Sequence, residues 1–174
     1  MRRSILLTLL LLDGCGETYR DTEVSMFAVA DFEPERFMGL WYEIARFPVP
    51  FQEDCTATTA EYQLVDAERV SILNTCRLGS PDGPVDQIEG IADIAGPGQL
   101  EVRFPSVPFV MADYVVLWVD EGYDTAVVGV PSGSAGWILA RTPTIDPDTR
   151  SDAEAVLERN GYDTGRLIEV PHAP

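Results

Sequence analysis

The side chains that could do chemistry in this chain are few, and their types argue against catalysis. The only histidine, His172, lies in the C-terminal tail, so a Ser–His or Cys–His nucleophile pair is not expected within a folded core. Ser132 and Ser134 stand outside any Gly-x-Ser-x-Gly pattern. The chain has no lysine, which excludes a phosphate-binding P-loop. A pair of carboxylates could still act as acid and base, so an enzyme stays open as an alternative.

The charge of the chain excludes nucleic acid as a partner. Twelve basic residues, all of them arginine, stand against 29 acidic ones, which gives a net charge of −17. Binding to phosphates requires a basic surface. The acidity is typical of a well-solvated protein surface. No cofactor and no metal are predicted, because two cysteines and one histidine do not supply a usual zinc site.

Trp41 and Arg141 are the two residues whose placement suggests a closed sheet. Trp41 stands near the start of the first strand-like run and Arg141 at the end of the last. If an antiparallel sheet closes into a barrel, its first and last strands meet. The guanidinium can then lie over the indole, a contact worth about 0.5–2 kcal/mol. A barrel closed in this way forms a cup that can hold a ligand.

The elements that would position these residues are strands. Runs rich in β-branched and aromatic residues alternate with Gly- and Pro-containing turns. The predicted strands cover residues 40–47, 56–65, 70–78, 85–95, 100–104, 114–119, 125–130 and 137–141. This spacing predicts an all-β fold, an eight-stranded antiparallel up-and-down barrel.

A helix is predicted after the last of these strands. Pro147 lies in its first turn, Ala153, Val156 and Leu157 recur at helical spacing, and Gly161 ends it. One amphipathic C-terminal α-helix is therefore expected to pack on the barrel wall. A helical turn is also expected at residues 34–38, and a short strand at residues 167–170.

The N-terminal segment resembles an export signal. Basic residues precede an apolar run over residues 4–12, which is too short to span a membrane. The sequence Leu12-Asp13-Gly14-Cys15 resembles the lipobox of bacterial lipoproteins, although Asp13 departs from it. We expect residues 1–14 to be a lipoprotein-type signal peptide, residues 15–31 a lipidated Cys15 with a tether, and residues 32–174 the barrel domain. The expected location is the outer membrane of the cell envelope, held by a lipid anchor; a soluble periplasmic protein is the alternative.

If Cys15 carries lipid, the other two cysteines form an even pair. Cys55 and Cys76 flank a predicted hairpin turn near residues 65–68, which places them close together on adjacent strands. In an oxidising compartment they are expected to form a disulfide.

Three short blocks resemble the lipocalin family. Residues 37–47 contain Gly39 and Trp41 in the Gly-x-Trp pattern of the first block. Asp113-Tyr114 resembles the second block, in which Ala112 replaces the usual Thr, and Arg141 matches the third. The segments at residues 41–47, 141–145 and 161–163 are most similar to bacterial outer-membrane lipocalins of the apolipoprotein D type. The resemblance covers residues 32–171.

The resemblance implies a barrel open at one end, which binds small hydrophobic ligands such as fatty acids or lysophospholipids without covalent attachment. The protein would be a monomer or weak homodimer. Gly39, Trp41 and Arg141 would close the barrel. The alternatives are an enzyme on this fold that acts on a small lipid, and an envelope structural module without a ligand.

The residues expected to line the ligand site are mostly aromatic, because such side chains offer large apolar contact. They are Phe47, Tyr62, Ile88, Phe104, Phe109, Tyr114, Trp118 and Trp137. Tyr114 and Trp118 share parity on one strand, so both are expected on the same face. Arg46, Arg77 and Arg103 are the cations that could meet an acidic head group, although surface ion pairs with the many acidic residues are the other interpretation.

Overall fold

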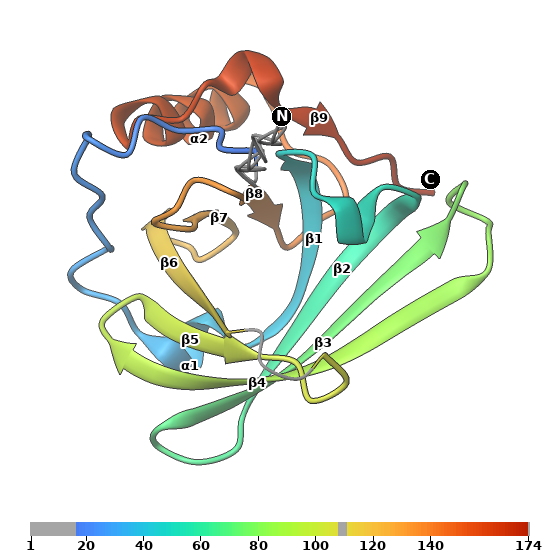
Figure 1. Ribbon diagram of the computed structural model, residues 1–174, viewed down its shortest axis with the longest axis horizontal. Helices are drawn as coiled ribbons and strands as arrows, with labels where there is room; N and C mark the ends of the chain where they lie inside the picture. Colours follow the sequence, from blue (N-terminus) through green and yellow to red (C-terminus); the bar gives the residue numbers. More distant parts are fainter. Residues whose placement is uncertain (1–16, 108–110, 174) are drawn as a thin grey trace, which may run out of the picture.

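Antiparallel strands close on themselves into a barrel in the computed structural model, which describes residues 17–107 and 111–173 (Figure 1). The strands within these residues are β1 (Gly39–Arg46), β2 (Cys55–Leu64), β3 (Arg69–Leu78), β4 (Val85–Gly96), β5 (Gln99–Arg103), β6 (Met111–Val119), β7 (Thr125–Gly129), β8 (Gly136–Ala140) and β9 (Ile168–Glu169). Each predicted strand lies within three residues of the observed bounds.

The barrel closes through β1, which pairs with both β2 and β8. Every other pairing from β2 to β8 joins strands that are neighbours in the sequence, as an up-and-down barrel requires. The short β9 pairs with the end of β1, where Arg46 faces Ile168. The predicted eight-stranded barrel is therefore confirmed, with β9 as an addition to its rim.

The predicted helix lies on the outside of the barrel. Helix α2 (Pro147–Arg159) is capped at its N-terminus by Asp146, whose side chain accepts hydrogen bonds from the backbone N–H groups of Asp148 and Thr149. A single turn, α1 (Pro34–Phe37), precedes β1, and 3₁₀ turns lie at η1 (Pro50–Gln52) and η2 (Thr164–Arg166). Within the described ranges, no helix is both long and apolar enough to cross a membrane.

The hydrophobic residues form two separate clusters, one on each face of the sheet. The interior cluster includes Phe37, Trp41 and Tyr62. The outer cluster joins the barrel wall to α2 through Ala153, Val156 and Leu157. Alternation of side chains along each strand divides the residues between these two clusters.

Residues 17–31 lie against the barrel, although the sequence pattern indicated a tether. Tyr19 and Arg20 are buried. Backbone N–H groups donate from Tyr19 to Gly133 O and from Val29 to Val116 O, at 2.8 and 2.9 Å. The apolar side chain of Met26 also packs on the outer cluster. The predicted signal peptide and Cys15 lie outside the described residues.

The predicted disulfide between Cys55 and Cys76 is confirmed. The two Cα atoms are 5.4 Å apart, and the bond joins the start of β2 to β3 near its end. Cys55 faces Leu78 in the β2–β3 ladder. The cross-link therefore holds together the two strands beside the η1 turn.

Candidate functional site

One end of the barrel is closed by Trp41 and Arg141. The guanidinium carbon of Arg141 lies 3.8 Å from the centroid of the Trp41 ring. The indole N–H of Trp41 donates to Phe37 O at 2.7 Å, and the Phe37 ring packs 4.8 Å from it, centroid to centroid. Gly39 begins β1 with φ +97°, a conformation that favours glycine. This end of the barrel is the floor.

Aromatic side chains line the barrel above this floor. The hydroxyl groups of Tyr62 and Tyr114 form a hydrogen bond of 2.8 Å. Tyr114 stacks on Trp137 with centroids 6.3 Å apart, and Tyr62 lies 5.3 Å from Phe37. Burial raises the pKa of Tyr62 to about 12.

Several inward side chains keep part of their surface exposed. Phe104, Tyr114 and Trp137 pack in the interior cluster, yet each is partly exposed. Ile88 is four residues before the inward-facing Ala92 on β4, so it lies on the same face, and it is also partly exposed. The Phe104 ring lies over Gly90, where a Cβ would be only 3.1 Å from it. These partly exposed side chains are the candidate lining of a ligand site.

Phe47 and Trp118 do not line the interior, contrary to prediction. Trp118 packs in the outer cluster, because a bulge between Val116 and Trp118 shifts the register with β7 and reverses the alternation after Val116. Tyr114 and Trp118 therefore lie on opposite faces.

Phe47 likewise belongs to the outer cluster. Its ring is stacked between Tyr19 and Tyr162, with both centroids 5.0 Å away. Phe109, the remaining predicted lining residue, lies outside the described residues.

A buried polar group on β1 was only partly anticipated. Arg46 Nη1 donates to Glu43 Oε1 at 2.9 Å, and both side chains are buried. Gln52, from the η1 turn, donates to Glu43 Oε2 at 3.0 Å and accepts from Trp137 Nε1 at 3.3 Å. Burial raises the pKa of Glu43, and the charge of Arg46 opposes this shift. Arg46 was named as a candidate, whereas Glu43 and Gln52 were missed; two charged residues within a largely apolar strand were the available signal.

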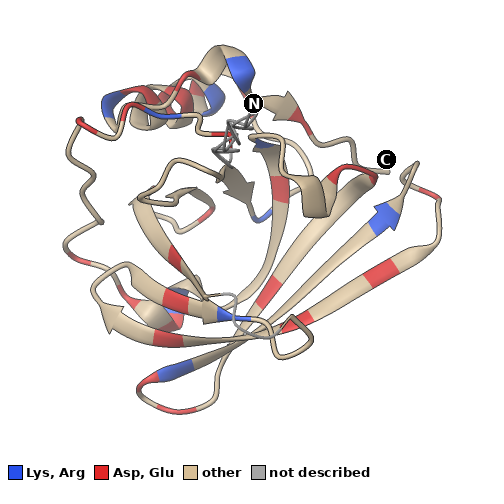
Figure 2. Cartoon of the chain, in the orientation of Figure 1, with Lys and Arg blue, Asp and Glu red and all other residues tan. Residues whose placement is uncertain are grey.

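The other two candidate cations are on the surface. Arg103 forms an ion pair with Asp93, and both side chains are about half exposed. Arg77 is exposed and donates to Gly83 O at 3.3 Å. Acidic residues are spread over several strands and α2 (Figure 2). Arg77 and Arg103 therefore make surface interactions, as the alternative interpretation of these cations expected.

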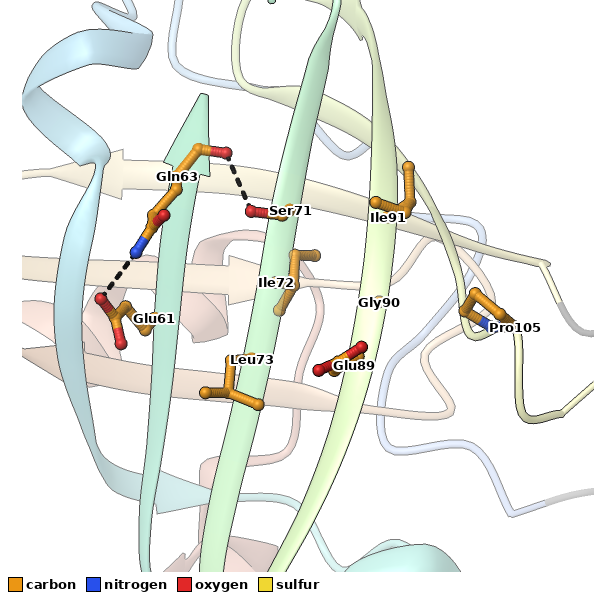
Figure 3. Close-up of a pocket in the computed structure, with 9 residues that line it drawn as sticks. All are labelled: Glu61, Gln63, Ser71, Ile72, Leu73, Glu89, Gly90, Ile91 and Pro105. Atoms are coloured by element: carbon orange, nitrogen blue, oxygen red, sulfur yellow. Dashed lines mark hydrogen bonds between the residues drawn. The ribbon is translucent and has the colours of Figure 1, made fainter. Parts of the chain in front are cut away.

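A hollow of about 370 Å³ lies on the outer face of β2, β3 and β4 (Figure 3). It is lined by Glu61, Gln63, Ser71, Ile72, Leu73, Glu89, Gly90, Ile91 and Pro105. Gln63 donates to Glu61 at 2.9 Å across one side of it. Glu61 and Glu89 face the same residue, Leu73, from the two flanking strands. This acidic hollow is therefore unsuited to an anionic head group, and the aromatic interior is the better ligand site.

The comparisons with known proteins agree with this geometry. A family model for the lipocalin-like domain matches residues 32–172. The outer membrane lipoprotein Blc of Escherichia coli is 36% identical over 146 residues, which cover 82% of this chain and 80% of Blc. Mouse apolipoprotein D is 30% identical over 153 residues, covering 82% of this chain and 78% of its own. The solved structure of insecticyanin from the tobacco hornworm matches with a TM-score of 0.67 at 22% identity, over 86% of this chain and 85% of that one. The chain belongs to the lipocalin family.

Proposed function

We propose that this protein binds and carries or stores small hydrophobic ligands, such as fatty acids or lysophospholipids, in the bacterial cell envelope, without catalysing a reaction. The observation that carries the proposal is the aromatic interior above a closed floor, where Phe104, Tyr114 and Trp137 remain partly exposed. Apolar pockets with a few polar groups are typical binding sites for small molecules.

Burial of the acyl chain is the source of affinity in this proposal. Each methylene removed from water contributes about 0.8 kcal/mol before the costs of association are subtracted. The Tyr62 and Tyr114 hydroxyl groups share one hydrogen bond, so each has a polar partner when a chain lies beside them. An eight-stranded barrel of this kind has room for one small ligand.

The proposed location rests on the N-terminal sequence and on the relatives. Leu12, Gly14 and Cys15 fit a lipobox, and similar proteins from several bacteria are named outer membrane lipoproteins. We propose that Cys15 is lipidated and anchors the barrel to the outer membrane. Labelling of cells with an alkyne fatty acid tests this: label on the wild type that is lost in Cys15→Ala supports the anchor, and an unlabelled wild type refutes it.

Tryptophan fluorescence tests ligand binding directly. Trp137 lies in the barrel interior, whereas Trp118 packs in the outer cluster beneath α2. Titration with dodecanoate or a lysophospholipid should change the fluorescence of the wild type in a saturable manner. Trp137→Phe should remove most of this change, and the matched control Trp118→Phe should retain it.

The two tryptophan variants distinguish a ligand bound inside the barrel from one bound outside it. A signal that survives in Trp137→Phe and disappears in Trp118→Phe would place the ligand outside the barrel. No saturable signal with either ligand, and no heat of binding by calorimetry on the folded protein, would refute lipid binding.

A further inference from the structure

Glu43 and Arg46 form a buried ion pair on the inner side of the barrel. Glu43 is 5% exposed and Arg46 is 4% exposed. In the β1–β8 ladder Glu43 faces Leu139, and Arg46 faces Trp137, both members of the interior cluster. The intervening Ala45 belongs to the outer cluster, because β1 is irregular between Glu43 and Ala45. This irregularity allows both charged side chains to face inward.

The hydrogen bonds of Arg46 leave one buried donor unused. Nη1 donates to Glu43 Oε1, and Nη2 donates to Gln52 O at 2.8 Å and to Cys55 O at 2.9 Å. Nε–H is buried and has no acceptor. Buried donors are nearly always paired, and an unpaired one is costly, so an oxygen atom that reaches Nε would be stabilised there.

The charge of Arg46 is already balanced within the pair. A carboxylate brought beside the guanidinium would add a second negative charge near Glu43, in a region where charges are poorly screened. An uncharged oxygen, such as an ester carbonyl or a hydroxyl, accepts the Nε–H bond without this repulsion. The pair therefore favours a neutral acceptor over an acid.

The residues between the ion pair and the barrel floor would orient such a ligand. Gln52 links the ion pair to the partly exposed Trp137, and the aromatic series continues through Tyr114 and Tyr62 toward Phe37 at the floor. An acyl chain that lay along these rings with its methyl end at the floor would have its oxygen-bearing end beside Arg46.

We propose that Arg46 and Glu43 form a head-group site for a neutral lipid oxygen, so that the protein prefers a fatty acid ester or alcohol to the free fatty acid of the same chain. This inference rests on the proposed function and specifies its ligand class. It assigns Arg46 Nε as the donor, and Glu43 as the residue that disfavours an acidic head.

The test compares two ligands that differ only in the head group. Dodecanoate and its glycerol monoester are titrated into the full protein, below their aggregation limits, at about pH 8, where the free acid is ionised. Wild type should bind the monoester about tenfold more tightly, the effect expected of one hydrogen bond from a charged donor. Glu43→Gln leaves the Arg46 charge unbalanced and should reverse the preference in favour of dodecanoate.

Two further variants test the Nε–H donor of Arg46 and the specificity of the Glu43 effect. Arg46→Lys keeps the charge but removes the Nε–H donor, so the advantage of the monoester should disappear. The matched control Glu61→Gln alters a carboxylate of the outer hollow and should keep the wild-type ratio. Circular dichroism checks that each variant is folded.

The outcomes distinguish this inference from the proposed function. Equal binding of both ligands by the wild type, or tighter binding of dodecanoate, would overturn the head-group site while leaving lipid binding intact. An unchanged preference in folded Glu43→Gln would also overturn it. Binding of neither ligand would refute the proposed function and this inference together; if Glu43→Gln fails to fold, the wild-type ratio still decides.

Discussion

Replacing Arg141 by methionine tests whether its contacts with Trp41 and the surrounding carbonyl groups hold the barrel floor together. Methionine keeps a long apolar side chain over the indole but removes the charge and all the donors. The guanidinium carbon lies 3.8 Å from the Trp41 centroid. The variant therefore separates the polar contribution of Arg141 from its packing.

The expected loss follows from the contacts of the guanidinium. Arg141 donates to the carbonyl oxygens of Arg36, Met38, Leu40 and Tyr123 at 2.8–3.2 Å. Some of these bonds are exposed, so we take about 0.5 kcal/mol for each, at the low end of the usual range. With about 1 kcal/mol for the cation–π contact, the free energy of unfolding should fall by about 3 kcal/mol.

Urea denaturation measures this difference, with circular dichroism and tryptophan fluorescence as independent probes. Arg103→Met is the matched control, because Arg103 forms a half-exposed ion pair with Asp93 that contributes about 0–1 kcal/mol. A loss in Arg141→Met no larger than that in the control would refute the role of Arg141 in closing the floor.

Three further changes follow from the geometry. Replacing both Cys55 and Cys76 by serine should lower the free energy of unfolding by about 2–4 kcal/mol, because the unfolded chain loses a cross-link; reduced wild type in urea should match the variant. Gly39→Ala should cost about 1–2 kcal/mol, because φ is +97° there; unchanged stability in thermal unfolding would contradict this. Burial raises the pKa of Glu43, against the effect of Arg46, so the folded state holds this proton more tightly than the unfolded chain. This contribution to stability is complete below the ordinary pKa of 4.5 and is lost as the pH rises through the raised pKa. The stability of wild type relative to Glu43→Gln should therefore fall in urea titrations as the pH rises above the ordinary pKa of 4.5; a rising difference would show that ion pairing outweighs burial.

Strand β1 carries residues of both the barrel floor and the buried ion pair. Its start carries Trp41 at the floor, and its end carries Arg46 beside the η1 turn. The same strand pairs with β2, β8 and β9. Because one strand positions both the floor and the ion pair, a change in its register would alter both.

The sequence by itself determined the strands, the helix and the contacts that close the barrel. Strand and turn signals are local, so their positions could be predicted within three residues. Trp41 and Arg141 lie at the two ends of the strand series, and closing such a series brings its ends together. The disulfide partners were predictable in the same way, because the hairpin between them aligns adjacent strands.

Only the tertiary structure decided which way several side chains face. The irregularities in β1 and β6 reverse the alternation, so Arg46 turns inward and Trp118 turns outward. A bulge depends on the pairing of two strands and leaves no periodic signal in either one. The Gln52 contacts with Glu43 and Trp137 could not be predicted either, because they join a turn to β1 and β8, two strands that are far apart in the sequence.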